Sequence, residues 1–182
     1  MQKLTYCKAI LAMDETNVHR IYHDNHYGFP ISDDNELFER LVLEINQAGL
    51  SWDTILKKEV NFKKAYKNFN VNKVANFQTA DFNRLMNNAG IIRNRLKINA
   101  AIHNANMILN LQKEFGSFKK WIDFHHPKTK DEWVKIFKKT FKFTGGEIVN
   151  EFLMSTGYLP GAHEKDCIIY QKTLNAGATF LK

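Results

Sequence analysis

The stretch LEINQAGLSW, residues 43–52, sets one carboxylate, Glu44, inside an apolar run, with the aromatic Trp52 eight residues later. Around it, one set of positions recurs at spacings of four, three and four: Leu37, Leu41, Glu44 and Ala48. This spacing predicts an α-helix from Asp33 to Ala48 whose buried face includes Glu44. Because burying an unpartnered carboxylate is costly, the Glu44 site must be hydrated, neutralised by a neighbour or reserved for a ligand.

Helical periodicity extends over most of the chain. In residues 91–111 the apolar side chains recur mostly at steps of three to five and describe one face. Proline occurs only at positions 30, 127 and 160, so no proline ring interrupts a helix between residues 31 and 126. We expect further helices near residues 60–67, 72–76, 80–87, 131–139, 146–156 and 164–174. The sequence therefore predicts an all-α fold.

Size and composition indicate a globular protein that folds alone. The chain has 182 residues, of which 44% are hydrophobic, enough for one domain or for two small lobes that share a core. No internal repeat and no Pro/Gly-rich linker supports a division of the chain. We therefore expect a single domain over residues 1–182, with two helical lobes as the alternative arrangement.

The charge balance is basic and favours an anionic partner such as nucleic acid. Lys and Arg number 26 and Asp and Glu 19, giving a formal net charge of +7. The alternative is that the source genome favours lysine and that these lysines only hydrate exposed helix faces. This alternative applies equally to one lysine cluster: Lys57, Lys58, Lys63, Lys64 and Lys67. No apolar stretch approaches the roughly 20 residues that span a bilayer, and the start MQKLTYCKAI lacks the features of a signal peptide. We expect a cytoplasmic protein without membrane association.

The cysteines and histidines form a candidate metal site. The motif HEKDC places His163 and Cys167 four residues apart, on one helical face or across a tight turn. Adding Cys7 and one nearby histidine gives the Cys2His2 composition of a closed tetrahedral zinc site. Spacing alone leaves that histidine open among His19, His23 and His26. The alternative is unrelated buried thiols and surface imidazoles.

Five motifs together carry a family resemblance: YHDNHYGFP, LEINQAGLSW, AGIIRNRLK, FKFTG and HEKDC. In this order they resemble the DNA-3-methyladenine glycosylase I family, from about Tyr6 to Cys167. The family belongs to the helix-hairpin-helix glycosylases, which implies such an element here and a single catalytic domain with a DNA-facing cleft. The resemblance also implies that the ligands of a structural Zn2+ are Cys7, His23, His163 and Cys167. His19 and His26 are then not ligands.

The resemblance implies that the protein is a monofunctional enzyme of base-excision repair. It would hydrolyse the N-glycosidic bond of 3-methyladenine in double-stranded alkylated DNA, with the base rotated out of the duplex, and release free 3-methyladenine. Glu44 corresponds to the carboxylate that reads the base, Trp52 to a stacking wall, and Tyr22 and Tyr27 to further pocket aromatics. The alternative for Glu44 is an ion pair with Arg40 or Lys58, and for each aromatic it is ordinary core packing.

Two further segments are candidates for DNA contact. Gln47, Gly49 and Leu50 lie in the turn that, by resemblance, faces the distorted duplex and fills the gap left by the extruded nucleotide. Residues 85–98 occupy the position of the hairpin. There, Gly90 permits a tight turn, and backbone N–H groups at a helix start near Ile92 can hold a phosphate. The side chains that can add positive charge to this segment are Arg93, Arg95 and Lys97.

The chain also departs from the family pattern. Ile45 and Asn46 stand where many members carry Gly-Gln, and Ala9 and His19 stand where aromatic residues are common. These changes concern substrate range and rate more than the class of protein. They motivate an alternative, a catalytically weak or inactive binder of damaged DNA on the same scaffold. A metal-dependent hydrolase is a third reading, which four protein ligands argue against because they leave no open position. We expect a monomer.

Overall fold

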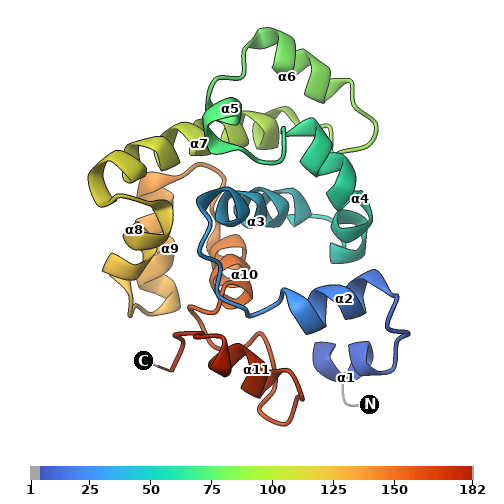
Figure 1. The fold of residues 1–182 in the computed structure, drawn as a ribbon. Helices are drawn as coiled ribbons and strands as arrows, with labels where there is room; N and C mark the ends of the chain where they lie inside the picture. The colour runs from blue at the N-terminus through green and yellow to red at the C-terminus, as the bar shows by residue number, and fades with distance from the viewer. Residues whose placement is uncertain (1–4, 182) are drawn as a thin grey trace. The chain divides into compact units, whose positions relative to one another are not determined.

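The structure is a computed structural model, which describes residues 5–181. Within that range all regular elements are helices and no strand occurs, which confirms the all-α prediction (Figure 1). The helices are α1 (Tyr6–Leu11), α2 (Val18–Asn25), α3 (Asp34–Gln47), α4 (Trp52–Ala65), α5 (Val71–Ala75), α6 (Thr79–Met86), α7 (Arg95–Phe115), α8 (Phe118–His125), α9 (Lys130–Thr140), α10 (Gly146–Ser155) and α11 (Tyr170–Asn175).

The chain forms two compact units, the terminal unit of Met1–Pro30 with Leu153–Lys182 and the central unit of Ile31–Phe152. The first unit therefore contains segments from both ends of the sequence. A single domain over residues 1–182 stays a prediction, and its outermost residues, 1–4 and 182, lie outside the described part.

Helix α3 is the core of the central unit, where it packs against α4, α5, α7 and α8. Its N-terminus is capped by the Asp33 side chain, which accepts hydrogen bonds from two backbone N–H groups of the first turn. The helix ends at Ala48, whose ψ of 116° is not helical. The predicted helix from Asp33 to Ala48 is thus confirmed. Residues 40–46 are all buried, including the carboxylate of Glu44.

Two long helices, α4 and α7, have bounds that differ by several residues from the predicted ones. The helix predicted at residues 91–111 is α7, which begins at Arg95 because the Asn94 side chain caps its first turn. It continues to Phe115 and stops at Gly116, whose φ of 89° closes the helix in the left-handed conformation. The helix predicted at residues 60–67 begins earlier, at Trp52, because Ser51 accepts a hydrogen bond from the Thr54 amide as a cap.

The prediction of helix for residues 164–174 is wrong in its first half. The motif HEKDC lies in a turn, in which the Cys167 amide donates to the Glu164 carbonyl at 2.9 Å, and helix α11 begins only at Tyr170. The short helices α1, α2 and α8 were not expected from periodicity, since six to eight residues give little periodic signal. Among the described residues, no helix is long and apolar enough to cross a membrane.

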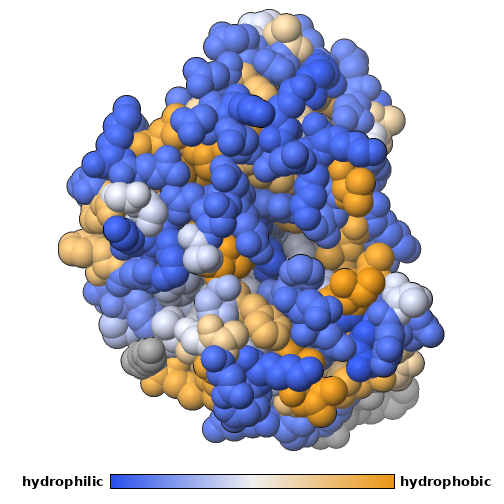
Figure 2. Space-filling model, viewed as in Figure 1, coloured by the Kyte–Doolittle hydropathy of each residue, from blue (hydrophilic) through white to orange (hydrophobic). Residues whose placement is uncertain are grey.

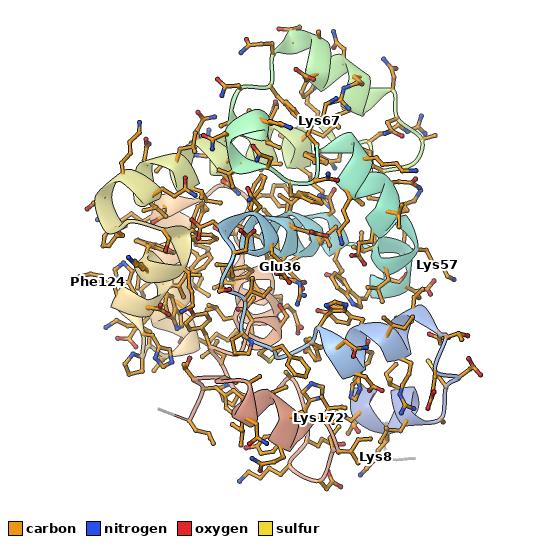
Figure 3. The ribbon with its side chains drawn as sticks, in the orientation of Figure 1. Lys8, Glu36, Lys57, Lys67, Phe124 and Lys172 are labelled. Atoms are coloured by element: carbon orange, nitrogen blue, oxygen red, sulfur yellow. The ribbon has the colours of Figure 1, made fainter. Side chains whose placement is uncertain are left out.

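The visible surface is predominantly hydrophilic, with apolar residues in separate patches (Figure 2). The labelled side chains of Lys57 on α4 and Phe124 on α8 extend outward (Figure 3). In the lysine cluster of α4, Lys57 pairs with Asp53 at 2.8 Å and Lys63 with Glu59 at 2.7 Å. These exposed pairs fit a solvated helix face, and each contributes less than about 1 kcal/mol.

Candidate functional site

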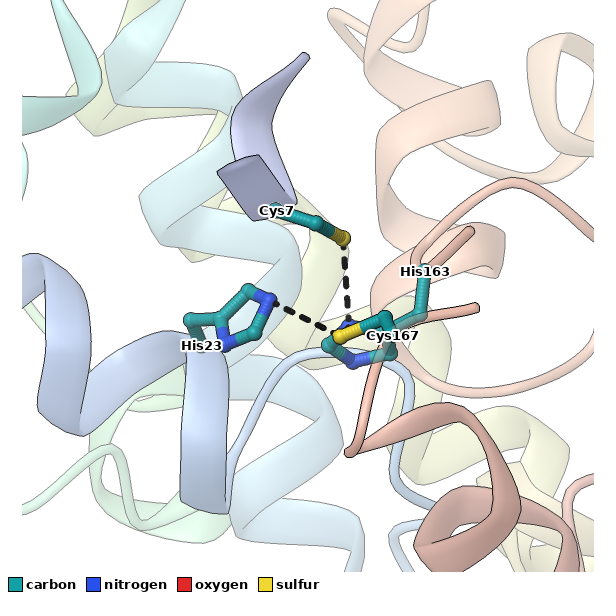
Figure 4. Close-up of side chains that lie close together, drawn as sticks. All are labelled: Cys7, His23, His163 and Cys167. Carbon is teal, nitrogen blue, oxygen red and sulfur yellow. Dashed lines mark hydrogen bonds between the residues drawn. The ribbon is translucent and has the colours of Figure 1, made fainter. Parts of the chain in front are cut away.

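Four side chains of the terminal unit converge on one point (Figure 4). Cys7 comes from α1, His23 from α2, and His163 and Cys167 from the turn before α11. Their ligand atoms all lie within 4.8 Å of one another, and all four residues are buried. The Cys7 Sγ and Cys167 Sγ each lie 3.8 Å from His163 Nδ1, and Cys167 Sγ lies 3.7 Å from His23 Nε2.

Each histidine of this cluster is oriented by a hydrogen bond through its other ring nitrogen. His163 Nε2 lies 2.7 Å from the Tyr27 carbonyl, which can only accept, so this nitrogen carries the proton. His23 Nδ1 lies 2.6 Å from Asp24 Oδ1, and the second Asp24 oxygen accepts from Arg20 Nε at 2.6 Å. The nitrogens that face the sulfur atoms are thereby left as lone-pair donors, the arrangement found around metal-binding histidines.

The donor set fits a closed tetrahedral metal site. Zn–S bonds of about 2.3 Å and Zn–N bonds of about 2.0–2.1 Å imply ligand-to-ligand distances of roughly 3.3–3.8 Å. The sulfur-to-nitrogen distances of 3.7 and 3.8 Å fall at the upper end of that range. Burial raises the pKa of the Cys7 thiol to about 11, a cost to the thiolate that a bound cation would offset. The cluster could therefore hold a metal ion.

The sequence left the histidine ligand open among three candidates, and the structure brings only His23 into the cluster. His19 Nδ1 lies 3.3 Å from the Tyr6 hydroxyl, and the His26 ring stacks on Tyr22 at 6.5 Å between centroids. Gly28 next to the site requires the absence of a side chain. Its φ is 78°, and a Cβ there would lie 3.2 Å from His163 Cδ2.

The predicted pocket aromatics Tyr22 and Tyr27 belong to the same unit and contact each other, with ring centroids 5.5 Å apart. Tyr27 also packs edge-on against His163 at 5.6 Å, so it is tied to the metal cluster by its ring as well as its carbonyl. Tyr6, which sequence reasoning did not select, packs edge-on against Tyr27 at 5.8 Å. The sequence signal that could have selected Tyr6 is its position next to Cys7.

In the central unit, Glu44 on α3 is only 4% exposed. Burial raises the pKa of its carboxyl to about 8, the nearby Arg40 charge acts in the opposite direction, and Glu151 adds to the rise. Lys58, one of the two alternative partners, instead donates to the carbonyls of Ala89 and Gly90 at 3.2 and 3.4 Å. The site of Glu44 thus favours the neutral carboxyl, and a bound ligand with a positive charge would favour the ionised form.

The turn after α3 is closed by two hydrogen bonds between the same two residues, Gln47 and Leu50. The Leu50 amide donates to the Gln47 carbonyl at 2.7 Å, and Gln47 Nε2 donates to the Leu50 carbonyl at 2.9 Å. Between them, Gly49 has φ of 83°, which favours glycine, and Leu50 remains 40% exposed. Trp52 follows as the first residue of α4, so this short turn connects the helices of Glu44 and Trp52.

The segment between α6 and α7 contains a tight turn at Gly90, as expected. The Gly90 amide donates to Asn88 Oδ1 at 2.8 Å, and a Cβ on Gly90 would lie 3.2 Å from Asn61. The helix start expected near Ile92 is wrong, because α7 begins three residues later and the Asn94 side chain already accepts from its first free amides. Arg93 and Arg95 are exposed, as a role in DNA contact requires.

Lys97 corrects another expectation. The sequence made Lys97 one of three side chains that can add positive charge to this segment, but the residue is only 5% exposed. Its Nζ donates to the Asn46 carbonyl at 2.9 Å and to the Ala48 carbonyl at 2.7 Å. Lys97 is therefore a buried contact of the turn after α3, which sequence reasoning missed.

Comparisons with known proteins show which proteins this chain is similar to. The family model described as methyladenine glycosylase matches residues 12–170. Among curated proteins, DNA-3-methyladenine glycosylase 1 of Escherichia coli (strain K12) is 37% identical over 171 residues, which cover 82% of this chain and 89% of that protein.

Solved structures show the same fold. A variant of 3-methyladenine DNA glycosylase I (TAG), crystallised in complex with 3-methyladenine, has a TM-score of 0.79 at 32% identity, covering 86% of this chain and 94% of that chain. The Staphylococcus aureus 3-methyladenine DNA glycosylase I, solved to explain its recognition of 3-methyladenine, has a TM-score of 0.78 at 33% identity and covers 86% and 93%.

Proposed function

This chain belongs to the methyladenine glycosylase family, and we propose that it is a DNA-3-methyladenine glycosylase that recognises the flipped, positively charged base through Glu44. The relatives named above act on 3-methyladenine, at 32–37% identity over most of this chain. The reaction is hydrolysis of the N-glycosidic bond in alkylated DNA. The base must leave the stack to reach a buried carboxylate, so base flipping is part of the proposal.

The observation that carries the role of Glu44 is a carboxyl that is only 4% exposed and whose pKa burial raises to about 8. Such a group costs free energy in the absence of a ligand. 3-Methyladenine in DNA carries a positive charge, so it can pair with an ionised Glu44 in a poorly hydrated site, where charge pairs are stronger than in water. Neutral adenine offers no such charge, and the pairing therefore discriminates against undamaged bases.

The same charge makes 3-methyladenine a good leaving group. The glycosidic bond of the damaged nucleotide is weakened by methylation, so the enzyme needs less acid-base chemistry than it would for an intact adenine. As the bond breaks, its electrons neutralise the base and positive charge develops on the deoxyribose, which an ionised Glu44 beside the base would also favour. Recognition then carries most of the selectivity.

Aromatic side chains complete the proposed recognition of the base. We assign Trp52, eight residues after Glu44 and at the start of α4, as a stacking surface. Stacking and cation–π attraction contribute about 0.5–2 kcal/mol for each ring on a cationic base. Tyr22 and Tyr27, which pack on each other in the terminal unit, stay further candidates for base contact.

The metal proposed for the Cys/His cluster is zinc with a structural role. Cys7, His23, His163 and Cys167 would hold it, and when bound it supplies a cross-link between the two ends of the chain with no open position for a water nucleophile. The oriented histidines support a specific site, since Asp24 and the Tyr27 carbonyl already fix both rings.

Contacts with duplex DNA are assigned to two segments of the central unit. The exposed Leu50, with Gly49 and Gln47, forms the wedge expected to fill the gap left by the flipped nucleotide. The tight turn of Gly90 and Ile92, with the exposed Arg93 and Arg95, is assigned to the phosphate backbone. Their arrangement as a helix-hairpin-helix element remains a proposal. We expect the enzyme to act as a monomer in the cytoplasm.

The direct test is release of 3-methyladenine from methylated duplex DNA by purified protein whose metal content has been measured. Free 3-methyladenine should appear in proportion to enzyme, with no adenine released from unmethylated DNA of the same sequence. A folded, metal-loaded preparation that releases no base from methylated DNA would contradict the proposal.

The second candidate function is a binder of damaged DNA with little or no catalysis. It is favoured by Ile45 and Asn46, which replace the Gly-Gln common in the family and are both fully buried directly after Glu44. The Asn46 side chain donates to the Val42 carbonyl at 2.8 Å, so it is committed to the helix. Salt-dependent binding to methylated DNA without base release would identify this function.

A further inference from the structure

The end of α3 is contacted by a buried ammonium group from α7. Lys97 Nζ lies 2.9 Å from the Asn46 carbonyl oxygen and 2.7 Å from the Ala48 carbonyl oxygen. Asn46 is two residues after Glu44, and Ala48 belongs to the turn that leads to Gly49 and Leu50. One side chain therefore joins both the helix of the base-reading carboxylate and the turn assigned as wedge.

These contacts satisfy backbone carbonyls that every helix leaves unpaired at its C-terminal end. The last carbonyls of a helix have no amide partner within the helix and carry partial negative charge. Asn46 lies in the last turn of α3, and at Ala48 the backbone leaves the helix with ψ of 116°, so both carbonyls belong to the helix end. A lysine ammonium can bond both and complements the helix dipole. Burial lowers the pKa of Lys97, and these two carbonyls compensate for its lost hydration.

Lys97 is also restricted on another side. Its Nζ lies 5.9 Å from the ring centroid of Phe143, within reach of cation–π attraction. The Phe143 backbone has φ of 61°, uncommon for an aromatic residue. The preceding residue, Lys142, is fixed by Asn104, which donates to its carbonyl at 3.0 Å and accepts from its amide at 2.8 Å. The ammonium thus bonds two carbonyls and lies near an aromatic ring, in a residue that is only 5% exposed.

We propose that Lys97 is a positioning residue, which fixes the turn of Gln47–Leu50 so that Leu50 enters the duplex at the correct depth while Glu44 keeps its place. This inference rests on the proposed function of the turn as a wedge. Lys97 touches neither base nor DNA backbone in this role. Its effect should be largest when the substrate is duplex DNA, because a single strand has no stack for the wedge to hold open.

The test compares Lys97→Met, which keeps the apolar stem and removes the ammonium, with Lys113→Met, which removes an exposed lysine from the same helix. Release of 3-methyladenine is measured on methylated duplex DNA and on the same DNA as single strands. We expect Lys97→Met to lower duplex release at least about tenfold, about 1.4 kcal/mol, and to lower single-strand release much less. Lys113→Met should leave both rates unchanged.

Amide hydrogen exchange gives a readout that does not depend on activity. The Leu50 amide is bonded to the Gln47 carbonyl, so its exchange should accelerate at least about tenfold in Lys97→Met if the turn loosens. An unchanged duplex-to-single-strand ratio together with unchanged Leu50 exchange overturns the inference while leaving the glycosylase function intact. If the unaltered protein releases no base, the proposed function fails, and the exchange of Leu50 alone decides whether Lys97 holds the turn.

Lys97→Met could also fail to fold, and the unaltered protein then supplies the evidence. A lysine ammonium bonded to two carbonyls in the interior should give a solvent-protected signal in spectra of protein labelled with 15N-lysine. Exposed lysine ammonium groups exchange their protons too fast to be seen at neutral pH. A protected signal correlated with the Asn46 and Ala48 carbonyls supports the inference, and its absence contradicts it.

Discussion

His163 Nδ1 lies 3.8 Å from Cys7 Sγ, although 156 residues separate the two in the sequence. The contact closes the terminal unit, in which segments from both ends of the chain share one small core of Cys7, Cys167 and Ile169. Bringing such distant segments together costs chain entropy. A metal ion held by this cluster would supply the stabilisation, because it binds the folded arrangement far better than the unfolded chain.

The first prediction concerns the metal ligands. Cys7→Ser replaces a thiolate ligand by a poor one, so the purified variant should contain less than about one tenth of the zinc of the unaltered protein. Its melting temperature should fall by on the order of 10 °C. His26→Ala, a change outside the cluster, serves as control and should keep one metal per chain. Equal zinc content in Cys7→Ser would show that the cluster is not the metal site.

The second prediction concerns the carboxylate behind His23. Asp24→Asn removes the charge 2.6 Å from His23 Nδ1 while keeping the shape of the side chain. The imidazole becomes a weaker and less well oriented ligand, so zinc affinity should fall about 10–100-fold in a competition titration with a chelator. Asp14→Asn, which changes an exposed carboxylate between α1 and α2, should have no effect. An equal loss of zinc affinity in both variants would show that Asp24 has no specific role in metal binding.

The third prediction concerns the effect of Glu44 on stability. Its folded pKa is raised from 4.5 to about 8, so the folded protein holds a proton that the unfolded chain has lost between these values. The contribution of protonated Glu44 to the free energy of unfolding is therefore full below about pH 4.5 and is lost as pH rises through about 8. Glu44→Gln removes this dependence, and above pH 8 it should be more stable than the unaltered protein by on the order of 5 kcal/mol.

Denaturant unfolding at several pH values measures that difference. The stability gained by Glu44→Gln should increase between pH 5 and pH 9 and be close to zero at the acidic end. Glu147→Gln, which changes an exposed carboxylate at the start of α10, should show no such trend. A difference that is constant with pH would mean that Glu44 is ionised throughout in the folded state.

The fourth prediction concerns the arginines of the α6–α7 segment. If Arg93 and Arg95 each neutralise one phosphate, replacing either by Ala should reduce the slope of log binding constant against log salt by about 0.9 on duplex DNA. Lys172→Ala, on α11 of the terminal unit, provides the control and should leave the slope unchanged. An equal change in all three variants would indicate a diffuse charge effect rather than contacts at this segment.

The sequence predicted the all-α class and the burial of Glu44 because the apolar positions of α3 recur regularly, and in the structure most of this helix is buried. The ends of α7 were misplaced because caps, not periodicity, set them: Asn94 starts the helix and Gly116 ends it. The convergence of the four candidate ligands follows from long-range contacts, which spacing alone does not specify. Only the family resemblance selected His23 over His19 and His26.

If the start of α7 had been predicted correctly, the sequence would also have indicated that Lys97 is buried. With α7 beginning at Arg95, one face carries positions at spacings of four, three and four: Lys97, Ala101, Asn104 and Ile108, all buried. This is the same pattern that marked Glu44 as an inward-facing charge. A buried lysine in such a row requires a partner just as a buried glutamate does, and here the partners are backbone carbonyls of a distant helix end.

The pH profile of base release by the unaltered protein and by Glu44→Gln tests the central claim most directly. Glu44 must be ionised to pair with the charged base, so kcat/KM for 3-methyladenine release from duplex DNA should rise with pH and level off above about 8. Glu44→Gln should be at least about tenfold slower at the plateau and lack the rise. Equal rates for the two proteins across the pH range would contradict the account.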